Sequence, residues 1–336
     1  MFKFGIWRAR DIERTRTVFA THRALAYSLL KTTDCADLTA VRRFEAVIKT
    51  VRLSSGSCRT TYGGRLAELD RQVQAILERL FPPERPIDVQ DWGVSDGLVA
   101  AEWSSLLFST YPSAKFTASD LILCFTEATR ESGEIYVVEP DGTPIQYINP
   151  PFVVSLYHRE HPIYPLNVAA RAWGARAIRS LKSAAGGIRW EKVPDETTWT
   201  KPPWTFRQIP LIHPRALSFA REQPNFRITR HDAFTASPAK CDILRVMNLY
   251  NPRVFSGEKL FQGLQAAFDS IEEGGLFIVG LTTDGAEARS DASIFQKIGG
   301  RFSVIGESAK GSELRDMALK IRAQLSRKDA WNRTKN

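Results

Sequence analysis

The stretch "IDVQDWGVSDGLVAAEW", residues 87–103, decides the fold predicted for this chain. Three apolar residues, Ile87, Val89 and Trp92, are interleaved with three polar ones over its first six positions, as in a strand, and its second half continues into a helical run. Gly93 and Gly97 separate the two. Glycine allows a sharp turn and lets a ligand approach the backbone closely. The stretch therefore predicts the first strand, turn and helix of an α/β sheet with a ligand site at the turn.

Strand and helix patterns alternate from residue 86 onward. The predicted strands are residues 87–93, 115–121, 225–234, 241–248, 274–281 and 300–308. The predicted helices are residues 97–111, 256–271 and 291–299. Such alternation is typical of crossover units on a parallel sheet. We expect an α/β fold with a doubly wound, mostly parallel sheet.

Two regions lie outside this alternation. Residues 1–85 form a predicted helical N-terminal region, with helices at 11–31, 37–52 and 65–81. Residues 125–210 interrupt the α/β domain of residues 86–330 as a long insertion. Within the insertion we expect a hairpin that turns at Asp141-Gly142, a basic helix at 167–187 and a loop at 190–206 rich in Pro, Trp and Thr. An insertion at the ligand edge of such a sheet is predicted to act as a lid.

The composition is that of a soluble globular protein, with 43% hydrophobic and 25% charged residues. No apolar run approaches the roughly 20 residues of a membrane span, and the first residues lack the apolar core of a secretory signal. The four cysteines lie far apart without a CxxC pair, so we expect no zinc site and a reducing, cytoplasmic setting. The net charge of +9 is spread along the chain, so it favours a basic surface and supports a nucleic-acid partner only weakly.

Polar residues follow the predicted strands at the ends where ligands bind in parallel sheets. Asp91, Asp120 and Asp232 end the first three strands, and Asn248 ends the fourth. The carboxyl ends of parallel strands meet at one edge of the sheet. A carboxylate at the end of the second strand can accept hydrogen bonds from both hydroxyls of a ribose. Helix capping is the structural alternative for Asp91 and Asp120, and an ordinary turn is the alternative for Asp232.

Together these features resemble the class I S-adenosylmethionine-dependent methyltransferases. "DWGVSDG" is similar to the first motif of that family, with Ser95 where many members have glycine, and "AAFDSIEEGGLFIVG" is similar to its late Gly-Gly motif. Asp120 matches the family's ribose-binding acid, and Asp232 matches its acid near the adenine. The resemblance covers residues 86–320 outside the insertion. Residues 241–280 look most like the corresponding part of chemotaxis-receptor glutamate methyltransferases.

The resemblance implies a Rossmann-like methyltransferase sheet that binds S-adenosyl-L-methionine. The implied cofactor contacts are Asp91, Trp92, Gly93, Gly97, Asp120, Leu121, Asp232, Ala233 and Arg245. A nicotinamide cofactor is the nearest rival for the glycine turn, but the three-glycine GxGxxG pattern that cradles phosphates is missing. S-adenosylmethionine has no phosphates and needs no such cradle.

The methyl acceptor stays open. Asn248 and Tyr250 follow the fourth strand and are the catalytic candidates, with a structural role as the alternative. "NPPF", residues 149–152, is similar to a motif that binds amino groups in methyltransferases of amides or nucleobases, but it precedes its usual place, and a loop role is the alternative. The activities considered are therefore a methyltransferase of unknown acceptor, a nucleic-acid or protein amino or carboxyl methyltransferase, and a non-catalytic S-adenosylmethionine-binding or regulatory module.

Side chains within the insertion offer further candidates. His158 and His161 are possible general bases, with a solvated loop as the alternative. Trp190, Trp199, Trp204 and Phe206 can line a wall for an acceptor or can pack the insertion onto the domain. The sequence does not indicate the oligomeric state.

Overall fold

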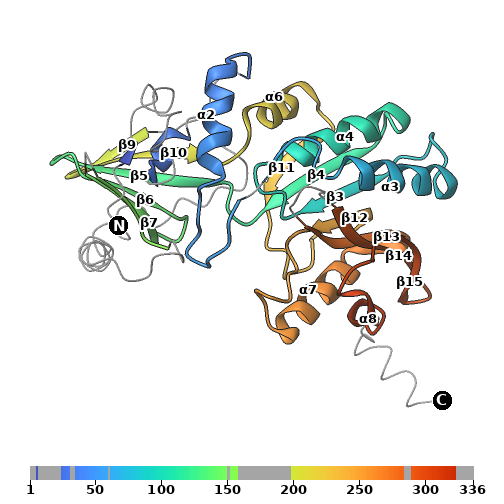
Figure 1. The fold of residues 1–336 in the computed structure, drawn as a ribbon. Coiled ribbons are helices and arrows are strands. Elements are labelled where there is room, and N and C mark those ends of the chain that lie inside the picture. The colour runs from blue at the N-terminus through green and yellow to red at the C-terminus, as the bar shows by residue number, and fades with distance from the viewer. Residues whose placement is uncertain are drawn as a thin grey trace.

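The computed structural model describes residues 5–6, 24–30, 35–59, 61–149, 152–157, 198–283 and 289–322. These residues form a seven-stranded sheet, a six-stranded sheet and a short parallel pair, β1 (Gly5–Ile6) and β2 (Ala24–Leu25). Figure 1 shows the two large sheets on opposite sides of the molecule, with β5, β6, β7, β9 and β10 at the left and β3, β4 and β11–β15 at the right.

The seven-stranded sheet contains the strand and turn predicted within residues 87–103. In spatial order its strands are β11 (Phe226–Arg230), β4 (Lys115–Asp120), β3 (Asp88–Trp92), β12 (Cys241–Met247), β13 (Ile271–Thr283), β14 (Arg289–Ile298) and β15 (Arg301–Ser308). The first five strands are parallel, whereas β14 is antiparallel to both β13 and β15.

Helices cover both faces of the seven-stranded sheet (Figure 1). On one face lie α3 (Ala67–Leu80), α4 (Leu98–Thr110) and α6 (Pro214–Glu222); on the other lie α7 (Gly257–Asp269) and α8 (Arg315–Ala318). Successive strand residues point to opposite faces, so Ile243 joins the first core and Leu244 the second. The predicted mixed α/β fold is confirmed, and so is the parallel pairing of five strands. Double winding is not confirmed, because a hairpin and not a helical crossover connects β14 to β15.

The predicted helix at residues 291–299 is wrong, because these residues belong to β14. Ile294 and Phe295 are adjacent, yet both are fully buried, and the pairing of β14 with β15 shifts register between them. The extra residue of this irregularity, Ile305, lies in β15, and within β14 Ile294 and Phe295 face opposite cores. A strand covered on both faces also loses its polar side, so its apolar spacing was mistaken for a helical one.

The six-stranded sheet is antiparallel throughout. In spatial order its strands are β8 (Phe152–Ser155), β7 (Pro144–Asn149), β6 (Ile135–Val138), β5 (Cys124–Arg130), β10 (Trp204–Pro210) and β9 (Thr198–Lys201). All six strands lie in the chain between β4 and β11, in the segment predicted as an insertion. The hairpin predicted at Asp141-Gly142 is confirmed as the β6–β7 turn, where the Thr143 amide donates to the Asp141 carboxylate at 2.8 Å.

The loop predicted at residues 190–206 is wrong over its described part. β9 and β10 pair across Pro202-Pro203, with Lys201 opposite Trp204. Threonine and aromatic residues favour strands on both sides of the proline pair, and Trp199 stacks on Phe206 with ring centroids 5.2 Å apart. The basic helix predicted at residues 167–187 lies outside the described residues.

The N-terminal region divides between the two sheets. The buried side of α2 (Leu38–Ile48) packs on the six-stranded sheet, whereas α3 packs on the seven-stranded one. Asp37 caps α2 by accepting hydrogen bonds from the amides of Thr39 and Ala40, as predicted. Residues 11–23 of the first predicted helix lie outside the described residues. Residues 24–30 form β2 and the 3-10 helix η2 (Tyr27–Leu29) instead of its last turns. In the described part of the chain, every helix is too short or too polar to cross a membrane.

Candidate functional site

The strand order of the seven-stranded sheet reverses between β3 and β12, and ligands of open α/β sheets bind in the crevice at such a point. Gly93 follows β3 there, and Leu249 follows β12. Gly93 has φ +75°, and a Cβ on it would lie 2.9 Å from Cδ2 of Leu249. The backbone turn predicted at Gly93 is therefore present, and in this structure Leu249 covers it.

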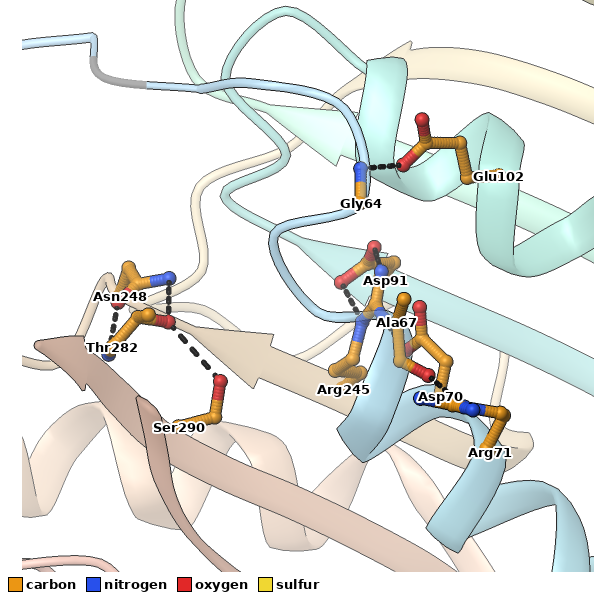
Figure 2. Close-up of polar contacts among 10 residues, drawn as sticks. All are labelled: Gly64, Ala67, Asp70, Arg71, Asp91, Glu102, Arg245, Asn248, Thr282 and Ser290. Atoms are coloured by element: carbon orange, nitrogen blue, oxygen red, sulfur yellow. Dashed lines mark hydrogen bonds and ion pairs between the residues drawn. The ribbon is translucent and has the colours of Figure 1, made fainter. Parts of the chain in front are cut away.

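Leu249 is held in this place by the residue before it. Asn248 has φ +61°, which is uncommon for a residue other than glycine. Its side-chain amide donates to Oγ1 of Thr282 at 3.1 Å, and its side-chain oxygen accepts from the Thr282 amide at 2.6 Å (Figure 2). Both polar atoms of Asn248 thus bind β13, which fixes the unusual backbone.

Gly97 serves the core and not the crevice. It has φ +77° and precedes the first turn of α4. A Cβ there would meet side chains of Ala216, Ile228 and Ile212 at 3.5–3.7 Å, all of them in the core under α4 and α6. The structure therefore gives Gly97 a turn and a packing role, and it does not bring Gly97 to the ligand side of the turn.

Asp91 points into the layer beneath α3 and α4. It lies on the same strand face as Val89, and it is 4% exposed. Its Oδ1 accepts from Nε of Arg245 at 3.1 Å and its Oδ2 from Nη2 at 2.5 Å. Nη1 of Arg245 donates to Asp70 of α3 at 2.5 Å, and Figure 2 shows Arg245 between the two carboxylates. We call Asp70, Asp91 and Arg245 the buried triad.

Two opposing effects act on the carboxylates of the buried triad, because burial disfavours their charged forms and Arg245 favours them. Arg245 is 1% exposed, and its guanidinium carbon lies 4.0 Å from the ring centroid of Trp103. Burial raises the pKa of Asp70 to about 6, although Arg245 opposes the rise, and burial also raises the pKa of Asp91. Two carboxylates share one cation away from water, so removing Arg245 would leave both uncompensated. Asp91 and Arg245 were both predicted to contact the cofactor, but in the structure the two side chains bind each other.

Asp120 ends β4 and lies nearer the surface, with a side chain 16% exposed. Its Oδ2 accepts from the Ser95 amide at 2.8 Å, and its Oδ1 accepts from the Ile122 amide at 3.1 Å. Nη2 of Arg59 also donates to Oδ1, at 3.1 Å. Asp120 therefore joins the glycine turn to the end of β4. Leu121 follows it and is 46% exposed, so its side chain is accessible at this edge.

The third predicted acid, Asp232, lies beside an aromatic pair. His231 packs on Trp92 with ring centroids 4.5 Å apart, and its amide donates to the Asp120 carbonyl at 3.1 Å. The Asp232 carboxylate accepts from the Phe234 amide at 3.0 Å. Burial lowers the pKa of His231, which favours its neutral form at pH 7. Trp92, Asp120 and Asp232 are thus brought to one edge of the sheet, as predicted.

Three buried polar atoms at this edge have no hydrogen-bond partner within the described part of the chain. They are Oγ of Ser95, Nε of Arg59 and Nε2 of His231. Buried polar atoms are nearly always paired, so a cluster of exceptions at strand ends is consistent with a ligand that completes them. Together with Asp120 and the exposed Leu121, these atoms make the β3–β4–β11 edge the best-supported site.

The two catalytic candidates are engaged in structural bonds. Asn248 is bound to Thr282, and Tyr250 is 1% exposed. The Tyr250 hydroxyl donates to the carbonyls of Ala233 and Gly263, and burial raises its pKa. Ala233 is itself buried and receives this bond through its backbone. Neither candidate side chain is presented to the crevice in this structure.

The remaining candidates lie on the six-stranded sheet or outside the described residues. Asn149 pairs with Phe152 across the β7–β8 turn, so the ends of "NPPF" frame a turn of that sheet, and its two prolines are not described. Trp204 and Phe206 are buried in the core of the same sheet. His158, His161 and Trp190 lie outside the described residues.

Sequence reasoning missed Arg59, Asp70 and Leu249. Asp70 adjoins Leu69 and lies three residues before Val73, on the apolar face of α3, and a charge on a buried face indicates a buried partner. Arg59 follows a Gly/Ser/Thr segment that resembles a simple break. No periodic pattern marks Arg59, because it contributes one side chain from irregular backbone.

Solved structures with a partial likeness to this chain include methyltransferases. One is an S-adenosylmethionine-dependent methyltransferase from Clostridium acetobutylicum, 12% identical, covering 77% of this chain and 80% of its own, with a TM-score of 0.29. Another is an O-methyltransferase family protein from Burkholderia thailandensis, 9% identical, covering 74% and 43%, with a TM-score of 0.28. A third is a putative sarcosine dimethylglycine methyltransferase from Galdieria sulphuraria, 8% identical, covering 66% and 48%, with a TM-score of 0.28.

This chain thus spans less than half the length of the second and third of these proteins. Likenesses at such scores carry no argument about activity, which must rest on the strand order and the strand-end residues. No family model matches the sequence, and no curated protein matches it either. The finer likeness to chemotaxis-receptor methyltransferases stays a prediction.

Proposed function

We propose that this protein is an S-adenosylmethionine-dependent methyltransferase whose cofactor binds at the carboxyl ends of β3, β4 and β11. The observation that supports this most is the combination of strand order and chemistry. Five parallel strands reverse order beside a left-handed glycine turn, and Asp120 ends the neighbouring strand. A nucleoside needs an acid for its ribose and an apolar face for its base, which Asp120 and Leu121 supply together.

In this proposal each strand-end residue has a defined task. Asp120 holds the ribose hydroxyls, and Leu121 contacts one face of the adenine. Asp232 and the backbone at Ala233 border the base, while Gly93 gives room at the turn. The buried triad with Asp91 and Arg245 supports the turn from below. The cofactor brings a methyl group already activated as a sulfonium, so the protein mainly aligns donor and acceptor.

Leu249 is the main obstacle to this assignment. It lies against Gly93 in the crevice, so a cofactor that passes over Gly93 requires its side chain to turn away. Leu249 is only partly buried, and rotation of such a side chain costs little compared with a backbone movement. The residues therefore fit the cofactor at the ribose and base. At the glycine turn, a rotamer change moves Cγ and Cδ2 of Leu249 away, whereas its Cβ stays 3.1 Å from the Cβ position of Gly93.

The insertion of residues 125–210 is proposed to cover the acceptor side of the site. β5 begins at Cys124, directly after the Asp120 strand end, and the Leu211 amide donates to the Leu123 carbonyl at 2.9 Å where the chain returns. Both ends of the insertion are thus anchored at the proposed cofactor edge. S-adenosylhomocysteine should slow hydrogen exchange at the ends of β5 and β10, and unchanged exchange there would count against a lid.

Calorimetric titration tests the cofactor assignment. We expect S-adenosylmethionine and S-adenosylhomocysteine to bind, and ATP not to bind, because ATP shares the adenosine but adds phosphates for which the turn has no cradle. Absence of binding by both sulfur compounds would reject the proposal. Binding of ATP alone would reassign the site to a nucleotide.

A non-catalytic S-adenosylmethionine-binding module is the second candidate. The observation that favours it is the structural engagement of Asn248 and Tyr250, which leaves no candidate base presented after β12 within the described residues. Transfer of a labelled methyl group to components of a cell extract distinguishes the two. Labelled products support an enzyme, and binding without any labelled product supports the module.

A further inference from the structure

Residues 52–59 form a small hairpin that reaches from the six-stranded sheet to the proposed cofactor edge. Arg52 and Cys58 form an antiparallel bridge, and the Leu53 amide donates to the Ser57 carbonyl at 2.9 Å. Ser54 anchors the hairpin, because its amide and hydroxyl donate to the two Glu139 carboxylate oxygens at 2.7 and 2.6 Å. The other end of the hairpin delivers Arg59.

Arg59 is inserted between the loops that follow β3 and β4. It is 4% exposed, although it comes from irregular backbone. Nη1 donates to the Ser95 carbonyl at 2.6 Å, and Nη2 donates to the Ile122 carbonyl and to Oδ1 of Asp120. One guanidinium therefore ties the glycine turn, the end of β4 and the proposed ribose acid into a single network.

The hydrogen bonds of Asp120 leave one of its oxygens less occupied. An ionised carboxylate accepts about four hydrogen bonds. Oδ1 receives two, from Arg59 and the Ile122 amide, whereas Oδ2 receives one, from the Ser95 amide. Arg59 and the two amides thus fix the plane of the carboxylate and leave capacity on Oδ2 for a ribose hydroxyl.

Arg59 could instead block the site and leave when a ligand arrives. Removing one partner of a buried, hydrogen-bonded charge pair is strongly unfavourable, and it would weaken ligand binding by roughly 10²–10³-fold. A neutral ribose does not replace the lost cation. Asp96 is buried nearby, and burial raises its pKa to about 6, although the positive charge of Arg59 opposes the rise. Asp96 would lose this electrostatic attraction if Arg59 left. These costs favour an arginine that stays.

We infer that Arg59 is a positioning residue that orients and neutralises Asp120 for recognition of the cofactor ribose. This inference rests on the proposed function, since it needs a ribose at Asp120. Arg59 does not touch the reacting atoms. It acts through Asp120 and through the Ser95 carbonyl, which belongs to the glycine turn.

The test compares Arg59→Gln with the parent protein, using S-adenosylhomocysteine and its analogue without the ribose 2′-hydroxyl. In the parent, loss of that hydroxyl should weaken binding about 10-fold. In Arg59→Gln, S-adenosylhomocysteine should bind about 10-fold more weakly, and the analogue should bind nearly as well as the full compound, because Asp120 is no longer aligned. A merely structural role would leave the penalty for the missing hydroxyl unchanged.

Two further variants keep the test decisive. Ser54→Ala removes one of the hydrogen bonds that anchor the same hairpin to Glu139 and leaves Asp120 unchanged. The affinity that this variant loses without the ribose 2′-hydroxyl should therefore equal the loss in the parent. Arg59→Lys keeps the positive charge but lacks the paired N–H donors of the guanidinium. The loss of affinity that this variant shows for the analogue should lie between those of the parent and Arg59→Gln. Arg59→Lys replaces Arg59→Gln if thermal melting shows Arg59→Gln to be unfolded. Tighter binding of S-adenosylhomocysteine by Arg59→Gln would show a blocking residue and overturn the inference. Failure of the parent to bind either compound would instead reject the proposed function.

Discussion

Asp91 and Asp120 stand near the ends of neighbouring parallel strands, and each is paired with an arginine, yet the two pairs differ in what they can do. The Asp91 carboxylate is buried under α3 and α4, where Arg245 takes both of its oxygens. Asp120 lies at the sheet edge, and Arg59 takes only one of its oxygens. The same residue type at a strand end therefore serves stability in one place and remains accessible to a ligand in the other.

The difference follows from how far each acid lies along the sheet, because Asp91 pairs with Ala118, two residues before Asp120, and both acids therefore point to the same face. Asp91 is the second-to-last residue of β3 and points to the face that the helices cover. Asp120 is the last residue of β4, where the chain leaves the sheet and the helices no longer shield it. A shift of two positions along the sheet separates a buried ion cluster from a candidate ligand contact. Single substitutions can test this separation, from the largest expected effect to the smallest.

Arg245→Met should have the largest effect, and it should act on stability. It leaves two buried carboxylates without a cation, and such a loss costs about 3–5 kcal/mol. Chemical denaturation measures the free energy of unfolding. Lys240→Ala is the control, since it breaks the exposed Lys240–Glu272 pair and should cost less than about 1 kcal/mol. Equal stability of Arg245→Met and the parent would show that the buried triad adds nothing.

Asp120→Asn should act on binding instead. It replaces the charge that the ribose hydroxyls would meet, so affinity for S-adenosylhomocysteine should fall by about 1.5–3 kcal/mol. Asp91→Asn is the matched variant, and its affinity should stay at the parent value, because Asp91 is buried beneath the helices. If the two variants lose affinity equally, the proposed division between the two acids is wrong.

How far the sequence predicts this molecule can be argued from the same acids. Alternation and glycine placement located β3, β4 and the turn at Gly93, because those signals are local. They placed Asp91 and Asp120 at strand ends but could not tell their environments apart. Which face of β3 lies beneath α3 depends on packing between distant segments. Asp70, Asp91 and Arg245 are separated by up to 175 residues, so no local pattern joins them.

The failures at β14 and at β9–β10 have local causes of their own. β14 is covered on both faces, with Ile294 in one core and Phe295 in the other, so it lacks the apolar–polar alternation that identifies a strand. Pro202 and Pro203 suggest a loop, yet they occupy only the turn between two strands rich in threonine and aromatic residues. The contribution of Arg59 could not be predicted, because irregular backbone carries no period that reveals where a side chain points.

Asp70→Asn should change the pH dependence of stability. The folded pKa of Asp70 is about 6, above its unfolded value of about 3.9, so the folded state holds the proton more tightly. This contribution is present at low pH and is lost as the pH rises from about 4 to about 6. Asn resembles the protonated acid, so the variant should gain on the order of 3 kcal/mol relative to the parent across that range.

Denaturation at several pH values compares the two proteins. Asp96 also has a pKa raised by burial to about 6, but it is present in both, so the difference isolates Asp70. A variant that loses stability relative to the parent as the pH rises would show the opposite sign. In that case the attraction of Arg245 would outweigh burial, and the buried triad would favour a charged Asp70.

Gly93→Ala should have the smallest effect, about 1–2 kcal/mol of destabilisation, with two separable causes. One is the backbone at φ +75°, and the other is Leu249, whose Cδ2 would lie 2.9 Å from the new Cβ. Gly64 has φ +74°, and a Cβ on it would meet no atom within 4 Å, so Gly64→Ala measures the backbone cost alone. The excess cost at Gly93 should fall when Leu249→Ala is added, because Cγ and Cδ2 are removed and only the Cβ of residue 249, at 3.1 Å, remains. If Gly93→Ala costs no more stability than Gly64→Ala, the Leu249 side chain moves away from residue 93 without a measurable loss of stability. A ligand could then enter the crevice that Leu249 fills without a further free-energy cost.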